Sequence, residues 1–202
     1  VLFAQGVLAL SSHRAVAVVG TRKPTVSGQE TTRRLCREWA TNGIRIVSGL
    51  ARGIDEIAHR TALEQGGETI AVLGCPLDGL GTLGRGQLAQ QIAAAGAIVT
   101  EHPFEAPVVA ANFVRRNRII SGLSQAVVVT EAPLGSGALI TARNALEQDR
   151  ELLACPGPVG ASTFEAGSGA LGAGVACAAA AGAAGFGAPA GLASGGFAAG
   201  AA

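Results

Sequence analysis

Short apolar runs alternate along most of the chain with longer segments whose apolar positions repeat at helical spacing. The apolar runs predict six strands, at residues 15–19, 44–48, 69–73, 97–100, 126–130 and 151–155. A continuously apolar run, rather than an alternating one, is typical of a strand that is buried on both faces of a parallel sheet.

The segments between these runs read as helices. Residues 27–41, for example, place Leu35 and Trp39 four positions apart, on one helical face. Similar patterns cover residues 54–65, 86–95, 112–123 and 137–148. Because strand and helix alternate, the strands should be parallel and joined by right-handed crossovers. The pattern therefore predicts an α/β fold with a doubly wound, mostly parallel Rossmann-like sheet.

Composition divides the chain near residue 160. Residues 161–202 are mostly alanine and glycine, and their only charged residue is Glu165. Such a segment has few large apolar side chains that could offset the entropy lost on ordering. We therefore expect one domain over residues 1–160 and a separate Ala/Gly-rich tail over residues 161–202.

Overall charge and cysteine content exclude several classes of protein. The net charge is only +1, so any affinity for nucleic acid must come from local clusters of cations. The four cysteines and three histidines show no metal-ligand spacing, and no metal or cofactor is expected. No signal peptide or run of about 18 apolar residues is visible, which favours a cytoplasmic protein without a membrane segment. The chain contains no methionine, so we expect it to be a fragment.

Three predicted strands end in loops of small residues that lead directly into a helix. These loops are Gly20–Thr25, Ser48–Gly53 and Glu131–Gly137, with Ser136 as a candidate N-cap. In a sheet of this type, ligands bind beyond the carboxyl ends of the strands. Helix N-termini at that edge offer free backbone N–H groups to an anion. Arg22, Lys23 and Arg52 add cations to two of these loops, so the edge is predicted to bind phosphate.

A second group of cations lies in the segment FVRRNRII, residues 113–120. On a helix, Arg115 and Arg118 share a face, while the apolar residues can anchor the opposite side. Arginine is suited to bidentate phosphate contacts and to stacking on bases. The simpler alternative is a solvated basic helix face.

Evidence for catalysis is weak by comparison. Asp55 and Glu131 are the candidate carboxylate catalysts, but a first-turn helix acid and a loop residue are simpler interpretations. Residues 79–84 match the pattern GxGxxG of dinucleotide-binding proteins, although Cys75–Asp78 separate that pattern from the preceding strand.

Six motifs together resemble the DNA-processing protein A family, known as DprA or Smf. They are AVAVVGTRKPT (15–25), IVSGLARGIDEIAHRTAL (46–63), TIAVLGCPLD (69–78), FVRRNRIISGLS (113–124), VVVTEAPLGSGALITARNAL (127–146) and LACPG (153–157). They occur in the order and spacing of the family, and the resemblance covers about residues 1–158.

The resemblance implies a protein that binds and protects incoming single-stranded DNA. It also implies that the protein loads a RecA-type recombinase on that strand during natural transformation, without catalysing a reaction. Implied partners are therefore single-stranded DNA, the recombinase and a single-strand binding protein, and the implied assembly is a homodimer. The DNA-binding residues that it implies are Arg22, Lys23, Ser48, Gly49, Arg52, Gly53, Arg115, Asn117, Arg118, Ser136 and Gly137.

The sequence departs from the family pattern in one segment near this edge. Members of the family usually carry Tyr-Pro and a nearby Asn after the Leu-Asp pair, where this chain has GLGTLGRGQ, residues 79–87. Arg85 in that segment is a candidate replacement for the missing contact. Two enzymatic alternatives also stay open. One is a nucleotide hydrolase of the phosphoribohydrolase type, and the other is a dinucleotide-dependent oxidoreductase that uses residues 79–84.

Overall fold

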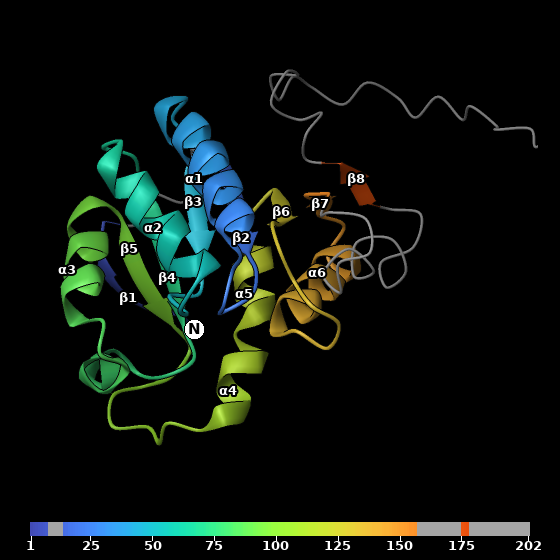
Figure 1. Cartoon of the computed structure of the whole chain (residues 1–202). Helices are drawn as coiled ribbons and strands as arrows, with labels where there is room; N and C mark the ends of the chain where they lie inside the picture. The colour runs from blue at the N-terminus through green and yellow to red at the C-terminus, as the bar shows by residue number, and fades with distance from the viewer. Residues whose placement is uncertain (8–13, 157–174, 178–202) are drawn as a thin grey trace, which may run out of the picture.

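The computed structural model describes residues 1–7, 14–156 and 175–177 of the chain. In this part, eight strands form a single sheet in the order β1-β5-β4-β3-β2-β6-β7-β8 (Figure 1). β1 pairs with β5 in the antiparallel sense, and every other neighbouring pair is parallel. The strands are β1 (Phe3–Gly6), β2 (Ala15–Val19), β3 (Arg45–Ser48), β4 (Thr69–Leu73), β5 (Ala97–Thr100), β6 (Ala126–Val129), β7 (Glu151–Ala154) and β8 (Val175–Cys177).

Helices cover both faces of the sheet. One face is covered by α1 (Val26–Thr41), α2 (Ile54–Glu64) and α3 (Gly86–Ala95). The other face is covered by α5 (Asn117–Gly122) and α6 (Gly137–Glu147), with α4 (Ala110–Arg115) directly before α5. A 3₁₀ helix, η1 (Leu77–Leu83), follows β4. Within the described ranges, no helix has the length and apolar character needed to cross a bilayer.

The doubly wound α/β prediction is confirmed, because each of the six predicted strands is present to within one residue at its ends. Four of the five predicted helices are also present to within one residue. The exception is the segment 112–123, which forms two short helices that meet at Arg116. The apolar pattern did not predict β1, an edge strand, or β8, which lies in the segment set apart as the tail. The domain boundary near residue 160 stays a prediction.

The GxGxxG segment does not form a dinucleotide-binding turn. That turn requires a strand, a tight glycine loop and an α-helix in direct succession. Here residues 79–83 belong to η1, and Gly84 follows with a φ angle of 64°. The glycines therefore shape a 3₁₀ segment rather than the N-terminus of a crossover helix.

Alternation of side chains along each strand divides the core into two layers. On β2, Ala17 and Val19 pack beneath α5 and α6, while Val16 and Val18 pack beneath α1 and α2. All five residues of β2 are buried, as the continuous apolar run predicted. Burial on both faces makes β2 the rigid centre of the sheet.

The position of β2 creates the switch point of the sheet. β2 pairs with β3 on one side and with β6 on the other, all in the parallel sense. The loop after β2 leads to α1 on one face, and the loop after β6 leads to α6 on the other. Loops that diverge in this way leave a crevice beyond the carboxyl ends of the strands.

Candidate nucleic-acid interface

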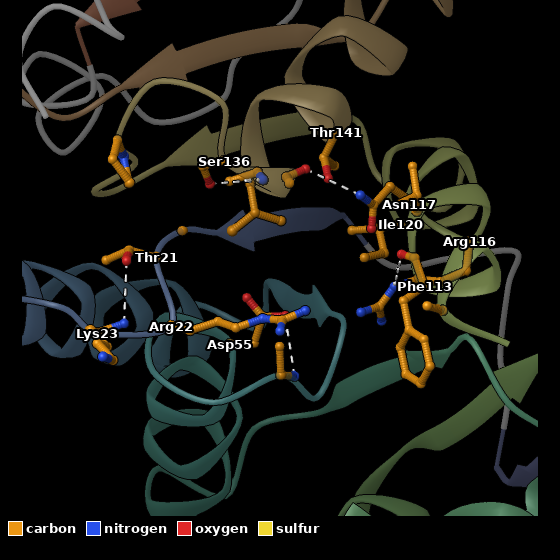
Figure 2. A pocket seen from close by; sticks show the side chains of 18 residues that line it. Thr21, Arg22, Lys23, Asp55, Phe113, Arg116, Asn117, Ile120, Ser136 and Thr141 are labelled. Carbon is orange, nitrogen blue, oxygen red and sulfur yellow. Dashed lines mark hydrogen bonds between the residues drawn. The ribbon is translucent and has the colours of Figure 1, made fainter. Parts of the chain in front are cut away.

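Two adjoining cavities occupy this crevice, and we refer to them together as the groove. Their volumes are about 440 Å³ and about 740 Å³. Six residues line both, so the cavities are continuous: Arg22, Lys23, Ala51, Ala110, Phe113 and Arg116. Figure 2 shows that Arg22 extends into the first cavity from the loop after β2, while Arg116 enters from the helix side.

The loop after β2 is held in place by its neighbours on both sides. The backbone N of Thr21 donates to Glu131 O at 2.6 Å, and Thr21 O accepts from the backbone N of Ile54 at 3.2 Å. Gly20 leaves no room for a side chain, because a Cβ there would lie 2.5 Å from the side chain of Ile54. The loop is therefore fixed, while the side chains of Arg22 and Lys23 are exposed on it.

Strained backbone shapes the loop after β3. Leu50 is fully buried with a φ angle of 55°, a conformation that is costly for a residue other than glycine. Gly53 has a φ angle of 81°, and a Cβ at this position would lie 2.4 Å from Thr21 O. This constraint explains the glycine at position 53, and Gly49 is required because a Cβ there would lie 2.2 Å from Arg116 Nη1. The two glycines let the loop pack closely against its neighbours, and Arg52 between them is exposed at the rim.

Asp55 stabilises this loop from the first turn of α2. Its Oδ2 atom accepts hydrogen bonds from the backbone N of Gly49 at 3.1 Å and of Ala51 at 3.3 Å. The side chain is buried, and this burial raises the pKa of Asp55, although the nearby charge of Arg116 and the two backbone hydrogen bonds act in the opposite direction.

Arg116 is a buried cation at the junction of α4 and α5. Its Nη1 donates to Gly49 O at 2.6 Å and also to Val72 O, and its Nε donates to Phe113 O at 3.3 Å. Burial lowers the pKa of Arg116, and the neighbouring charge of Asp55 counteracts that effect. The residue is only 5% exposed, so it sets the potential at the groove wall rather than reaching out to a ligand.

The loop after β6 completes the far wall. Ser136 is the N-cap of α6, as predicted, and its Oγ accepts from the backbone N of Ala138 at 3.1 Å. Asn117 Nδ2 donates to Gly137 O at 3.1 Å, which links α5 to the start of α6. Glu131 lies at the base of this loop, and its carboxylate accepts from both the backbone N and the hydroxyl of Thr25.

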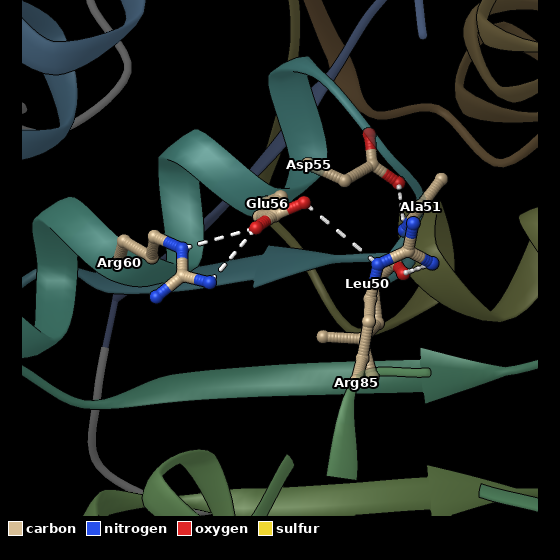
Figure 3. A network of polar contacts seen from close by, with 6 residues as sticks. All are labelled: Leu50, Ala51, Asp55, Glu56, Arg60 and Arg85. Atoms are coloured by element: carbon tan, nitrogen blue, oxygen red, sulfur yellow. Dashed lines mark hydrogen bonds and ion pairs between the residues drawn. The ribbon is translucent and has the colours of Figure 1, made fainter. Parts of the chain in front are cut away.

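A third cavity, of about 390 Å³, extends the groove between α2 and α3. Arg52 and Arg85 line both this cavity and the larger one of the groove. Arg85 Nη1 donates to Leu50 O at 3.0 Å, and its Nε lies 3.8 Å from Glu56 Oε2 (Figure 3). Glu56 also pairs with Arg60 at 2.9 Å. Glu56 therefore neutralises part of the positive charge along this extension.

The structure brings together most of the residues that the sequence assigned to DNA. Seven of the eleven line the groove: Arg22, Lys23, Gly49, Arg52, Asn117, Ser136 and Gly137. Ser48 and Gly53 are not among the residues that line the groove. Ser48 is buried, and its Oγ donates to Val18 O at 2.7 Å, so it joins β3 to β2.

Arg115 and Arg118 lie apart from the groove. The predicted continuous helix is broken at Arg116, so Arg115 belongs to α4 and Arg118 to α5, but both line one separate cavity beside Glu101 and His102. Arg118 forms an ion pair with Glu101 there. The FVRRNRII segment therefore presents cations on two sides of the helix pair.

Phe113 and Arg116 are residues of the groove that the sequence pattern did not identify. The pattern does contain a sign of their position, because Phe113, Arg116 and Ile120 fall three and four residues apart. An arginine on the apolar side of a helix is expected to be buried with specific partners. The sequence prediction instead assigned the ligand contacts to the exposed arginines Arg115 and Arg118, because they are three residues apart.

The two carboxylates considered for catalysis both make structural bonds. Asp55 accepts from two backbone amides, and Glu131 accepts from Thr25. Over the residues that the structure describes, no group of three or more His, Cys, Asp or Glu side chains is placed to hold a metal ion.

Comparison with known proteins agrees with this architecture. The family model for DNA recombination-mediator protein A matches residues 1–182. The chain belongs to this family. Protein Smf of Escherichia coli is 49% identical over 160 residues, which are 79% of this chain and 43% of that protein. DNA processing protein DprA of Bacillus subtilis is 42% identical over 158 residues, or 78% of this chain and 53% of that protein. The chain thus spans about half the length of these family members.

Solved structures of the family share the fold. The X-ray structure of DNA processing protein A from Streptococcus pneumoniae matches with a TM-score of 0.76 and 37% identity, covering 82% of this chain and 58% of that one. The protein from Helicobacter pylori, described with a unique single-stranded DNA binding mode, matches with a TM-score of 0.74 and 34% identity. That match covers 81% of this chain and 75% of the other. A molybdenum cofactor binding protein from Rippkaea orientalis, at 18% identity and a TM-score of 0.52, shares the fold alone.

Proposed function

We propose that the chain is a non-catalytic, single-stranded DNA-binding scaffold of the cytoplasm. In this role it protects incoming DNA and loads a RecA-type recombinase on it during natural transformation. The main observation that supports the proposal is the groove at the switch point of the sheet, which is lined by exposed cations on hydrogen-bonded loops. The relative from Helicobacter pylori, which is described as binding single-stranded DNA, supports the choice of ligand.

The chemistry of the groove suits a strand without sequence preference. Arg22, Lys23 and Arg52 are exposed along it and can each contact a phosphate. Phe113 lines both cavities and is partly exposed, so its ring can stack on a base. Binding through phosphates and stacking should depend steeply on salt and weakly on base identity.

The nucleotide-hydrolase alternative requires a carboxylate that is free to act as a general base. In the groove, Asp55 is buried and its carboxylate is occupied by two backbone amides. The oxidoreductase alternative requires a glycine turn that residues 79–84 do not form. The scaffold is therefore the favoured function.

The test is binding of a fluorescently labelled oligo-dT strand, followed by anisotropy at two salt concentrations, against the matching duplex. We expect tighter binding to the single strand, with affinity that falls as salt rises. Arg52→Ala should weaken binding several-fold without unfolding the domain, whereas Arg37→Ala, an exposed arginine on α1, should not. Salt-independent binding, or equal affinity of the two variants, would contradict the proposal.

Recombinase loading and the remaining partners need separate assays. Loading predicts that the chain accelerates RecA filament formation on a strand coated with single-strand binding protein. The proposed homodimer predicts twice the monomer mass in sedimentation equilibrium. If the chain binds single strands but does not accelerate RecA filament formation, the loading part of the proposal is wrong and the strand-binding part stands.

A further inference from the structure

The third cavity, between α2 and α3, differs in chemistry from the groove that it extends, and we call it the α2–α3 cavity. Its volume of about 390 Å³ is within the range of small-ligand sites. Among the described residues that line it, only Leu88 has an apolar side chain, whereas Phe113 and Ile120 are among the apolar residues of the groove. Arg52 and Arg85 line both spaces, so a ligand bound in the groove can extend into the α2–α3 cavity.

The charged side chains on one side of the α2–α3 cavity already restrain one another. Arg60 donates to Glu56 Oε1 at 2.9 Å, while the Nε of Arg85 lies 3.8 Å from Glu56 Oε2 (Figure 3). Arg85 also donates to Leu50 O at 3.0 Å. Each oxygen of the Glu56 carboxylate therefore faces a different guanidinium group. Guanidinium planes that are held in this way can stack on a nucleic-acid base.

Two carboxamides on α3 are the uncharged polar side chains of the α2–α3 cavity. Gln87 and Gln91 lie one helical turn apart, and both are exposed. Neither side chain has a hydrogen-bond partner among the described residues. Both are therefore free to bind a ligand. Neither belongs to the DNA-binding residues that the family resemblance implies, and Gln87 lies in the segment that departs from the family pattern.

A carboxamide selects among bases because it presents a donor beside an acceptor. Adenine offers the matching pair at N7 and N6, which is why glutamine binds it with two hydrogen bonds. In a single strand the opposite edge is also accessible, so N1 and N6 offer a second pair. Guanine presents two acceptors at O6 and N7 instead, and these suit an arginine. Two free carboxamides beside arginines that are already engaged therefore favour adenine.

We infer that the α2–α3 cavity receives one base of the bound strand and favours adenine, which Gln87 and Gln91 bind along its edges. This inference rests on the proposed function and adds a base preference at one position. Arg52 holds a phosphate where the cavity joins the groove, so the neighbouring base can turn toward α3. Arg60 and Arg85 stack on that base, while the groove itself accepts any sequence.

The test compares dT strands of about 12 nucleotides that differ at one central position, a length within the usual range of such sites. Fluorescence anisotropy measures their affinities. The strand with a central dA should bind at least about fivefold more tightly than uniform dT, the discrimination that a bidentate pair of hydrogen bonds supplies. A central 7-deazaadenine, which lacks N7, should lose part of this gain. A central dG should bind less tightly than a central dA.

Variants on α3 assign the preference to the cavity. The double variant Gln87→Ala, Gln91→Ala should bind uniform dT like the wild type but should no longer prefer dA. Gln90→Ala is the matched control, since Gln90 is exposed on the same helix and does not line the cavity. It should keep the full preference. If the double variant also keeps the preference, adenine is bound elsewhere and the inference is wrong.

The outcomes separate this inference from the proposed function. If the wild type binds every strand equally, with affinity that falls as salt rises, the proposed function stands and the inference fails. If it binds no strand, both fail. Arg52→Ala should weaken binding of all the strands and leave the ratio between dA and dT unchanged. A preference for dG over dA would overturn the assignment to adenine.

Adenosine monophosphate is the remaining probe, because a free nucleotide carries the same base. A rise in melting temperature with this nucleotide that the double variant lacks, without any preference for dA in a strand, would show a free-nucleotide site. That result would overturn the assignment to a base of the bound strand.

Discussion

The guanidinium of Arg116 donates a 2.6 Å hydrogen bond to the backbone oxygen of Gly49, across 67 positions of sequence. The same nitrogen bonds Val72 O at the end of β4. A Cβ on Gly49 would lie 2.2 Å from that nitrogen, so the glycine is required for the approach. One buried arginine therefore holds the α4–α5 junction against two strand ends and sets the shape of the groove.

Replacing Arg116 should destabilise the fold. Arg116→Ala leaves Asp55 buried without its compensating charge and removes the guanidinium donor from the backbone oxygens of Gly49 and Val72. We expect the free energy of unfolding to fall by about 3–5 kcal/mol. The free energy of unfolding of Arg116→Lys should lie between the values for the wild type and Arg116→Ala, because an ammonium group keeps the charge but lacks the planar fork of donors. Urea unfolding followed by circular dichroism measures the difference.

Arg115→Ala is the matched control, since it removes the adjacent arginine from an exposed position. It should leave the free energy of unfolding within about 0.5 kcal/mol of the wild type. Equal unfolding midpoints for the Arg115 and Arg116 variants would mean that the buried guanidinium contributes no net stability.

The fold followed from the sequence because each buried strand is a continuous apolar run bounded by small residues. β2 and β4, for instance, were predicted with the ends that the structure shows. β1 was not predicted, since it is a four-residue edge strand whose position depends on pairing with β5 rather than on its own pattern. Long-range pairing of this kind leaves little trace in a local window of sequence.

The candidate site was predicted less completely than the fold. The three glycine loops meet at one edge, because parallel strands place their carboxyl ends together. Arg116 was not separated from Arg115, although it falls three residues after Phe113 and four before Ile120, a spacing that indicates a position on the apolar side of the segment. Ser48 was assigned to the ligand from its motif, but its hydroxyl bonds a neighbouring strand. A motif fixes which residues are near a site and not the direction in which each one points.

Glu131 and Thr25 should be energetically coupled. The Glu131 carboxylate accepts from the backbone N of Thr25 at 3.0 Å and from its hydroxyl at 2.8 Å, and this hydroxyl also caps α1 through Gly28 N. We expect Glu131→Ala to cost about 1.5–3 kcal/mol of stability, as for hydrogen bonds to a charged group. Thr25→Val should cost about 1 kcal/mol because the cap of α1 is removed.

A double-mutant cycle measured by urea unfolding tests this coupling. Because the two residues share their bonds, the double variant should lose less stability than the sum of the single variants, by at least about 0.5 kcal/mol. Strict additivity would show that the two side chains act independently.

Removing the charge of Glu56 should strengthen binding of single-stranded DNA. Glu56 pairs with Arg60 at 2.9 Å and lies 3.8 Å from Arg85, so it neutralises cations that border the groove. Glu56→Gln should raise the affinity for oligo-dT a few-fold at low salt, and the gain should shrink as salt screens the charges. Glu30→Gln is the control, since Glu30 pairs with Arg33 on α1 in the same way. A gain of the same size in both variants would reflect net charge alone.

His59 is a buried histidine whose hydrogen bonds fix its proton. Thr69 Oγ1 donates to Ile46 O at 2.9 Å, so it must accept from His59 Nδ1, which lies 2.7 Å away. The other ring nitrogen, Nε2, then carries a lone pair, is buried and has no partner among the described residues. A second proton there would create a buried positive charge, so burial lowers the pKa of His59 to about 3, and the charge of Arg116 acts in the same direction.

This histidine should make the fold sensitive to acid. Between the ordinary pKa of 6.5 and the folded value of about 3, the unfolded chain binds a proton that the folded chain does not. The free energy of unfolding should therefore fall as pH decreases through this range, by up to about 1.4 kcal/mol per unit. His59→Gln should be less stable at neutral pH but should show a shallower fall in urea unfolding between pH 7 and pH 4. Asp55, whose raised pKa has the opposite effect, is present in both proteins and cancels in the comparison. Parallel pH profiles for the two proteins would exclude His59 as the source of acid sensitivity.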